Sequence, residues 1–521
     1  MKYVRVAIAY LLFLSAAQAQ ELYSYSVFLT AKENVQQLHH PQEFLSKRAL
    51  LRREKQNIAI KQSDLPLSPD RLGAIDNLVS YKGPHSKWLN SVYVEATSEE
   101  IVALSELGFV KEIVPVSGHT FTTTSIALQL DHGYSFDQLD QIGLIEGLHN
   151  REYIGQDKLI AVLDAGFVGA NSVEISQNLR ILATRNFVEG GSNVYQGSSH
   201  GFSVLSAMAS WNDGILIGSA PGAEYVLIKT ERELSETPQE MYNWIAGAEY
   251  ADSLGADIIN SSLGYSEFDD PSNSYTVNDL DGRTSVISLG AVAAARTGML
   301  VVTSAGNAGG GPWNKITMPA DADSILSVGS VNQYGIVSAF SSRGYTTDGR
   351  TKPNVCARGE GAIIYRSDGT LAAANGTSFS APIIAGAAAC LWQSIPSASP
   401  QAVLKAIEVS SSHYYQRNER IGYGIPNFSL ARLYLNPNPT TEIVVYPNPF
   451  PDHVTFFLPD DATTEVDLEL RDIYGRVVVR ETVSGRRYRF RWVPGDYLPA
   501  GTYFLHISRG NYSQVSQLLK I

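Results

Sequence analysis

Short apolar runs alternate with helix-like runs through the middle of this 521-residue chain, and this alternation limits the possible folds more than any other feature. The strand-like runs are mostly Val, Leu, Ile and Ala, which is typical of parallel strands buried on both faces. We predict strands at 159–163, 225–229, 257–261, 300–303 and 325–329, and helices near 238–254, 285–297 and 376–393. The pattern predicts an α/β domain with a doubly wound parallel sheet and a site at the carboxyl ends of its strands.

Three polar residues at the ends of these elements have settings suited to nucleophilic catalysis. Asp164 ends an apolar run, His200 precedes a small-residue helical run, and Ser378 precedes a buried helix that has Pro382 in its first turn. The positive end of a helix dipole stabilises a developing oxyanion, but a serine needs a base to act as a nucleophile. The chain order Asp, His, Ser differs from the order in chymotrypsin and in the α/β-hydrolases.

A fourth residue, Asn307, ends the apolar run that begins at residue 299. Its side-chain amide offers a donor to a tetrahedral oxyanion, and loss of such a donor costs about 3–4 kcal/mol of transition-state stabilisation. Taken singly, Asp164 could be a turn residue, His200 or Ser378 a helix cap, and Asn307 a loop residue. Four matching contexts in one order favour a catalytic site.

Residues from about 157 to 430 resemble the catalytic domain of the subtilases, the subtilisin-like serine proteases. The matching segments are Ala161-Val-Leu-Asp164, Ser199-His-Gly201, Gly218-Ser-Ala-Pro-Gly-Ala223, Ile258-Ile-Asn-Ser-Ser-Leu-Gly264, Ser304-Ala-Gly-Asn307, Lys352-Pro-Asn354 and Gly376-Thr-Ser-Phe-Ser-Ala-Pro382. The sequence departs from the family pattern after His200, where Phe202-Ser203 replaces Thr-His, and at Ala357-Arg-Gly359, where Ala-Pro-Gly is usual.

The resemblance implies a role for each site residue. Asp164 would orient and stabilise the imidazole of His200, which would act as general base and then as general acid. Ser378 would form the acyl-enzyme, and its backbone N–H would join Asn307 in the oxyanion hole. The groove in which the substrate pairs as an additional strand would be lined by Ser262, Leu263, Gly264, Ala305 and Gly306.

The N-terminal residues 1–19 are predicted to be a secretion signal. Lys2 and Arg5 precede the apolar run 6–14, and Ala17-Gln-Ala19 is a small-x-small cleavage site. The alternative is a membrane anchor, but the run is too short to span a bilayer.

Residues 20–122 form a small α+β unit that resembles the inhibitory propeptide of subtilases. Strands are expected at 22–30 and 110–116, and a capping box from Thr97 to Glu100 opens a helix over 101–107. Its basic cluster is expected on a solvated helical face: Lys47, Arg48, Arg52, Arg53 and Lys55. We place the cleavage in the Ser/Thr-rich stretch 117–125. The alternative is an N-terminal domain that the mature enzyme keeps.

The peptidase unit is assigned to 123–435. A second capping box, Ser135 to Gln138, precedes an expected helical face of Leu139, Ile142, Ile145 and Leu148.

After a stiff linker at 436–440, the pattern changes to alternating strands without helical periodicity, which predicts an all-β sandwich over 436–521. Strands are expected at 442–446, 453–458, 466–472, 476–481, 488–492 and 502–508. The unit resembles the type IX secretion (Por) sorting domain in Tyr446-Pro-Asn-Pro-Phe450, Asp472-Ile-Tyr-Gly-Arg476, Leu498-Pro-Ala-Gly-Thr-Tyr503 and Gln517-Leu-Leu-Lys520. That resemblance implies the type IX machinery as a partner and export to the cell surface or medium. A carbohydrate-binding or purely stabilising module is the competing interpretation.

The composition of the chain limits which other partners and cofactors we expect. A net charge of −12, without a basic aromatic stripe, argues against nucleic-acid binding. The two cysteines, Cys356 and Cys390, give no disulfide scaffold, and the sequence does not decide whether they pair. The chemistry requires no cofactor. Subtilases often bind calcium, and an acidic loop contains Asp269, Asp270, Asp279 and Asp281, but it lacks EF-hand spacing and we assign no ligand.

The sequence therefore predicts a secreted endopeptidase that acts on polypeptides and is inhibited by its own propeptide. A catalytically inactive binding module would be expected to lack a triad residue, and none is missing. Transpeptidation through the same acyl-enzyme remains open, because an amine can replace water.

Overall fold

The computed structural model describes residues 23–32, 35–115, 133–172, 179–233, 235–435, 445–446, 450, 453–457, 464–485, 489–495, 498–509 and 512–520. The predicted signal segment, the cleavage stretch 117–125 and the linker 436–440 lie outside the described residues.

A seven-stranded parallel sheet with the order β15-β12-β11-β10-β5-β9-β6 forms the centre of the peptidase unit. Its strands are β5 (Leu159–Asp164), β6 (Ile181–Asn186), β9 (Glu224–Lys229), β10 (Ile258–Ser261), β11 (Leu300–Ser304), β12 (Leu326–Val331) and β15 (Val355–Arg358). The doubly wound parallel sheet is confirmed, and the five predicted strands are its five inner strands. The two edge strands, β6 and β15, were not predicted.

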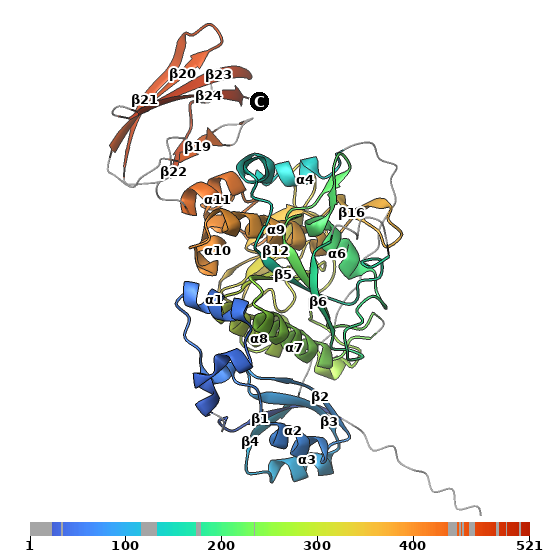
Figure 1. Ribbon diagram of the computed structural model, residues 1–521. Coiled ribbons are helices and arrows are strands. Elements are labelled where there is room, and N and C mark those ends of the chain that lie inside the picture. The colour runs from blue at the N-terminus through green and yellow to red at the C-terminus, as the bar shows by residue number, and fades with distance from the viewer. Residues whose placement is uncertain are drawn as a thin grey trace, which may run out of the picture.

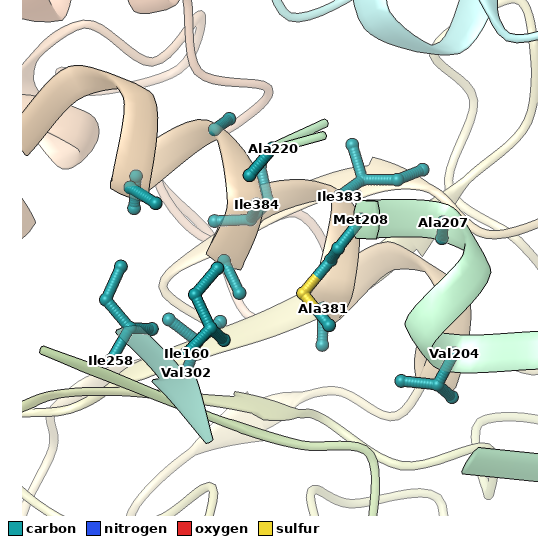
Figure 2. Close-up of a cluster of buried hydrophobic side chains, with 14 of the residues drawn as sticks. Ile160, Val204, Ala207, Met208, Ala220, Ile258, Val302, Ala381, Ile383 and Ile384 are labelled. Atoms are coloured by element: carbon teal, nitrogen blue, oxygen red, sulfur yellow. The ribbon is translucent and has the colours of Figure 1, made fainter. Parts of the chain in front are cut away.

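Helices cover both faces of this sheet (Figure 1). One face carries α7 (Gln239–Leu254) and α8 (Val286–Arg296), and the other carries α6 (His200–Ala209) and α9 (Thr377–Ser394). Alternate residues of β5 enter the two cores: Leu159, Ala161 and Leu163 pack towards α7, and Ile160 and Val162 towards α9. Figure 2 shows the second core, which contains Ile383 and Ile384 of α9 together with Ile160, Ile258 and Val302 of the sheet.

The second capping box does not form. Two short helices, α4 (Phe136–Asp140) and α5 (Leu144–Gly147), replace the expected continuous helix because Gly143 between them has φ 62°. Ser135 Oγ accepts the N–H of Ile217, and Gln138 bonds both backbone groups of Ile363. Tertiary partners therefore take the two side chains that the sequence pattern assigned to a helix cap.

Other elements complete the peptidase unit. They are α10 (Pro400–Val409), α11 (Phe428–Leu435), β7 (Trp211–Asn212), β8 (Leu216–Ile217), β13 (Gly344–Tyr345), β14 (Thr351–Lys352), β16 (Ala362–Tyr365) and β17 (Leu371–Ala374).

The N-terminal unit has a four-stranded antiparallel sheet with the order β2-β3-β1-β4. Its elements are β1 (Tyr23–Leu29), α1 (Lys47–Lys55), α2 (Pro69–Asp76), β2 (Tyr81–Ser86), β3 (Ser91–Ala96), α3 (Ser98–Ser105) and β4 (Val110–Pro115). The Thr97 capping box forms as predicted. The unit packs on α7, where the Glu249 carboxylate accepts the Ser86 hydroxyl and the N–H groups of Lys87 and Trp88.

In the basic cluster on α1, Lys47 and Lys55 are exposed as predicted, but the prediction of a solvated position was wrong for Arg52 and Arg53. Arg52 and Arg53 are at most 5% exposed and both bond the carboxylate of Asp252 on α7. Arg53 also pairs with Asp64 at 2.9 Å. Burial alone would raise the pKa of Asp252, but the attraction of the two arginines outweighs it and lowers this pKa. A buried ion-pair network therefore joins the N-terminal unit to the peptidase unit.

The C-terminal unit contains two antiparallel sheets, β18-β19-β22 and β21-β20-β23-β24. The strands are β18 (Val445–Tyr446), β19 (Val454–Phe457), β20 (Thr464–Asp472), β21 (Val477–Gly485), β22 (Arg489–Trp492), β23 (Gly501–Arg509) and β24 (Tyr512–Lys520), the last of which was not predicted. Side chains from both sheets, including Phe456, Trp492 and Leu468, share one core. The unit is therefore the expected sandwich.

No helix among the described residues is long and apolar enough to cross a bilayer.

Candidate active site

Asp164 and His200 meet at the carboxyl end of β5. Asp164 is fully buried, and its carboxylate accepts His200 Nδ1 at 2.8 and 3.0 Å. The Ala165 N–H also bonds Asp164 Oδ1 at 2.8 Å and holds the carboxylate in place. Gly201 permits the close approach of α6, because a Cβ there would lie 2.5 Å from the Gly166 carbonyl oxygen.

The pKa of His200 is raised above its ordinary value of 6.5. Burial alone would lower this pKa, but the charge of Asp164 and its hydrogen bond outweigh burial, and Glu233 adds a smaller contribution. Since Nδ1 is occupied by Asp164, Nε2 is the ring nitrogen available for proton transfer, and the side chain is 27% exposed towards the cleft.

Ser378 is the second residue of α9 and lines the same cleft as His200. The helix begins at Thr377, so Pro382 lies in its second turn, not in the first turn as predicted. A proline at 382 has no N–H for the Ser378 carbonyl, which instead accepts Ser262 Oγ at 2.8 Å. The nucleophile candidate is thus tied to the segment that follows β10.

Asn307 lies in the loop after β11 and lines the cleft. Its Oδ1 accepts the backbone N–H of Thr377 at 2.9 Å and the Thr377 hydroxyl at 3.0 Å. A backbone N–H can only donate, so these bonds fix which amide atom is the oxygen, and Nδ2 is the donor that this side chain can offer in the cleft that Ser378 also lines. Sequence reasoning missed Thr377 as the anchor of this amide.

The predicted groove residues divide into two groups. Ser262, Leu263, Gly264 and Gly306 line a cleft of about 400 Å³ together with His200, Asn307 and Ser378. Ala305 lies behind it, fully buried, with its N–H bonded to Val328 and its carbonyl to Thr317. Thr317 also lines the cleft, against the two glycines: a Cβ on Gly264 or Gly306 would lie 2.1 or 2.8 Å from Thr317 Oγ1.

Another side of the cleft is acidic, and sequence reasoning did not single it out. Glu231, Glu233 and Glu236, from the loop that follows β9, line the cleft next to Arg232. Three glutamates within six residues after a predicted strand were the available signal.

The acidic loop considered for calcium uses its carboxylates locally. Each of the four carboxylates accepts backbone N–H groups. Asp269 accepts the N–H of Glu236, and Asp270 accepts the N–H of Ser272. Asp279 accepts the N–H of Thr276, and Asp281 accepts the N–H groups of Arg283 and Thr284. In the described part of the chain, no group of three or more His, Cys, Asp or Glu is placed to hold a metal ion.

Both cysteines are buried and unpaired. Burial raises the pKa of the Cys356 thiol to about 12 and that of Cys390 further. Neither provides a thiolate nucleophile.

Comparison with known proteins matches each of the three units separately. Residues 155–424 match the model of the subtilase family, residues 24–128 the peptidase S8 propeptide domain of Bacteroidota, and residues 444–521 the secretion-system C-terminal sorting domain. Subtilisin E of Bacillus subtilis (strain 168) is 32% identical over 288 residues, which are 54% of this chain and 68% of that protein. The subtilisin of Bacillus pumilus is 31% identical over 288 residues, which are 54% of this chain and 94% of that protein.

The crystal structure of a mutant of the epidermin leader peptide processing serine protease (EpiP) from Staphylococcus aureus has the same fold. It aligns with a TM-score of 0.55 at 16% identity, over 79% of this chain and 99% of that one.

The sheet, the cleft and these matches define a serine-type endopeptidase with a subtilisin-like α/β fold. The chain belongs to the subtilase family, and it carries a propeptide domain before the peptidase unit and a secretion sorting domain after it. The sorting domain indicates export by type IX secretion to the cell surface or the extracellular space.

Proposed function

We propose that this protein is a secreted endopeptidase that hydrolyses peptide bonds through Asp164, His200 and Ser378, with Asn307 in the oxyanion hole. The observation that carries the proposal is the hydrogen bonding of His200 Nδ1 to both carboxylate oxygens of Asp164, in a cleft that Ser378 also lines. This arrangement fixes the imidazole with Nε2 as the acceptor that a base requires.

In the first half-reaction, Ser378 Oγ attacks the scissile carbonyl carbon and its proton passes to Nε2 of His200. Asp164 stabilises the imidazolium that forms. The oxyanion accepts hydrogen bonds from Nδ2 of Asn307 and from the N–H of Ser378 at the start of α9. His200 then donates the proton to the amine as the carbon–nitrogen bond breaks, and the acyl-enzyme remains.

In the second half-reaction, water attacks the acyl-enzyme carbonyl and gives its proton to His200. The tetrahedral intermediate collapses, the proton returns to Ser378 Oγ, and the carboxylic acid product leaves. The substrate chain would lie as an extended strand against Ser262, Leu263 and Gly264, because these residues line the cleft beside Ser378.

We infer a maturation order from the segments of the chain. Residues 1–19 direct transfer across the inner membrane, and residues 20–122 act as the inhibitor until cleavage within 117–125. The peptidase unit spans 123–435, and 436–521 engages the type IX secretion machinery. The contacts of Glu249 and Asp252 with the N-terminal unit support its association with the peptidase unit before cleavage.

The test is Ser378→Ala in the secreted full chain, with Ser394→Ala at the far end of α9 as the matched control. We expect Ser378→Ala to abolish peptide hydrolysis and to retain the propeptide, while its thermal unfolding remains cooperative. The Ser378→Ala chain is then incubated with a trace of wild-type enzyme, so that lack of processing does not mask activity. Hydrolysis by the processed variant at the wild-type rate would refute the proposal.

A further inference from the structure

Three glutamates meet on the acidic side of the cleft without a basic partner. Glu231 and Glu236 line the cleft, and Glu240 reaches them from the first turn of α7. Glu231 is 7% exposed and Glu240 is 2% exposed. None of the three glutamates forms an ion pair with a Lys, Arg or His among the described residues. Arg232 is exposed, and its charge acts on Glu189.

The hydrogen bonds of these carboxyl groups come from neutral donors. The Tyr265 hydroxyl bonds Glu231, and the N–H groups of Arg232 and Thr237 bond Glu240 at 3.0 and 3.3 Å. Oε2 of Glu236 is buried and receives no bond from a basic side chain, and the Glu236 side chain shares a hydrogen bond with the carboxyl group of Glu240. Two carboxyl groups can bond each other only while one of them keeps a proton, so no positive charge of the protein compensates this cluster.

The pKa shifts of the three glutamates agree with their burial and their closeness to one another. Burial raises the pKa of Glu231, Glu236 and Glu240, and mutual repulsion between the carboxyl groups raises it further for Glu231 and Glu236. A cation bound beside these carboxyl groups would favour their ionised forms and lower these pKa values.

A second and independent observation points to a ligand in the same cleft. Ser266 lines the cleft, is 1% exposed, and its Oγ has no hydrogen-bond partner. Thr317, 7% exposed, lines the cleft with an equally unpartnered Oγ1. Buried hydroxyls normally find partners, so the cleft presents an incomplete polar site rather than a closed structural network.

We propose that Glu231 and Glu236, backed by Glu240, form a subsite that takes a Lys or Arg side chain of the peptide substrate. This inference rests on the proposed endopeptidase function and specifies its substrate class. A basic side chain supplies the positive charge that the glutamates lack and an N–H donor for the hydroxyl oxygen of Ser266. A metal ion fits less well, because the carboxyl groups are not arranged as metal ligands in the described part of the chain.

The subsite is expected to increase the rate of cleavage rather than to be essential for it. The stretch 117–125, in which we place propeptide cleavage, contains no Lys or Arg. Intramolecular cleavage of the propeptide depends less on affinity for this subsite, because the other contacts of the propeptide already hold it on the peptidase unit. Substrates supplied in solution lack those contacts and depend on the subsite.

The experiment compares matched peptides that carry Lys or the uncharged isostere norleucine at each of the four positions before the scissile bond. It is run on the processed enzyme with EDTA present. Active sites are first counted with a fluorophosphonate probe, so a failure of the proposed function appears as absence of labelling. We expect kcat/KM to favour Lys over norleucine by about tenfold or more at one position.

Two variants, Glu231→Gln and Glu236→Gln, identify the residues responsible, and Glu360→Gln, in a different cavity, is the control. We expect each of the two to reduce the Lys preference severalfold while leaving cleavage of the norleucine peptide within about twofold. Equal cleavage of both peptides by labelled wild-type enzyme would overturn the inference. The inference would also be overturned if the preference for Lys survived both substitutions. A third contrary result would be that Glu236→Gln changes only the calcium-dependent thermal stability of the enzyme.

Discussion

Ser262 and Ser378 exchange hydrogen bonds at the base of the cleft. Ser262 Oγ donates to the Ser378 carbonyl oxygen at 2.8 Å, and Ser378 Oγ donates to the Ser262 carbonyl oxygen at 3.4 Å. The first bond exists because Pro382 cannot supply the usual helical N–H. The start of α9 is thus held by the segment that follows β10, which fixes the position of the proposed nucleophile relative to the cleft.

Removal of this bond should slow the chemistry more than it weakens binding. We expect Ser262→Ala to lower kcat by about tenfold, since small displacements of a nucleophile are costly, and to cost about 1 kcal/mol of stability. Steady-state kinetics with a peptide substrate measure the split between kcat and KM. Ser262→Thr keeps the hydroxyl and should restore most of kcat; equal loss in both variants would argue against a role for this bond.

The pH dependence should follow the imidazole. His200 acts as a base only when neutral, and although burial would lower its pKa, Asp164 and Glu233 hold that pKa above 6.5. Therefore kcat/KM should fall as the pH drops through a value above 6.5. Glu233→Gln removes one stabilising charge, lowers that pKa and should shift the acidic limb to lower pH. Glu360→Gln is the control and should leave the acidic limb in place. If Glu233→Gln also left the acidic limb in place, Glu233 would not act on His200.

Asn307 should contribute to the transition state and little to substrate binding. We expect Asn307→Ala to reduce kcat by about 10²–10³-fold with KM nearly unchanged, because its Nδ2 is the proposed oxyanion donor. Asn307→Asp retains an oxygen for the N–H of Thr377 but lacks the donor, and should be at least as slow. If Asn307→Asp kept wild-type kcat, the side chain would matter only as an anchor for Thr377.

The buried Arg52–Arg53–Asp252 network should stabilise the precursor and not the mature enzyme. In a Ser378→Ala background that prevents processing, Asp252→Asn leaves buried arginines undercompensated, at a cost of about 3–5 kcal/mol. Thermal unfolding measures this as a lowered Tm.

The control for that measurement is Asp76→Asn, which removes an exposed pair with Lys82 and should cost no more than about 1 kcal/mol. After removal of residues 20–122, Asp252→Asn should have little effect on Tm. A similar loss in precursor and mature enzyme would mean that the network stabilises the peptidase unit itself.

The sequence predicted what local patterns encode. Inner strands such as β5 are apolar at nearly every residue because both faces are covered, and the four candidate catalytic residues occur in recognisable contexts at the ends of such elements. The edge strand β6 was missed because Thr184 and Arg185 interrupt its apolar pattern, and β15 because its sequence Val-Cys-Ala-Arg has one β-branched residue and ends in arginine.

The sequence could not predict what long-range contacts decide. Arg52 and Arg53 look solvated on their own helix, and only the docking against Asp252, about 200 residues away, buries them. Ser135 and Gln138 have capping-box spacing, but Ile217 and Ile363 take their side chains. The clustering of Glu231, Glu236 and Glu240 likewise depends on how the loop after β9 folds against α7 and Tyr265.

The central claim is that Ser378 is the activated nucleophile. The most direct measurement is labelling of the secreted protein with a fluorophosphonate probe, followed by mass spectrometry of the intact and digested chain. The account predicts one label, on Ser378, in a species that has lost the residues before about 122, and no label in Asp164→Asn or Ser378→Ala. A correctly processed and folded chain that takes no label, or that is labelled at another serine, would contradict it.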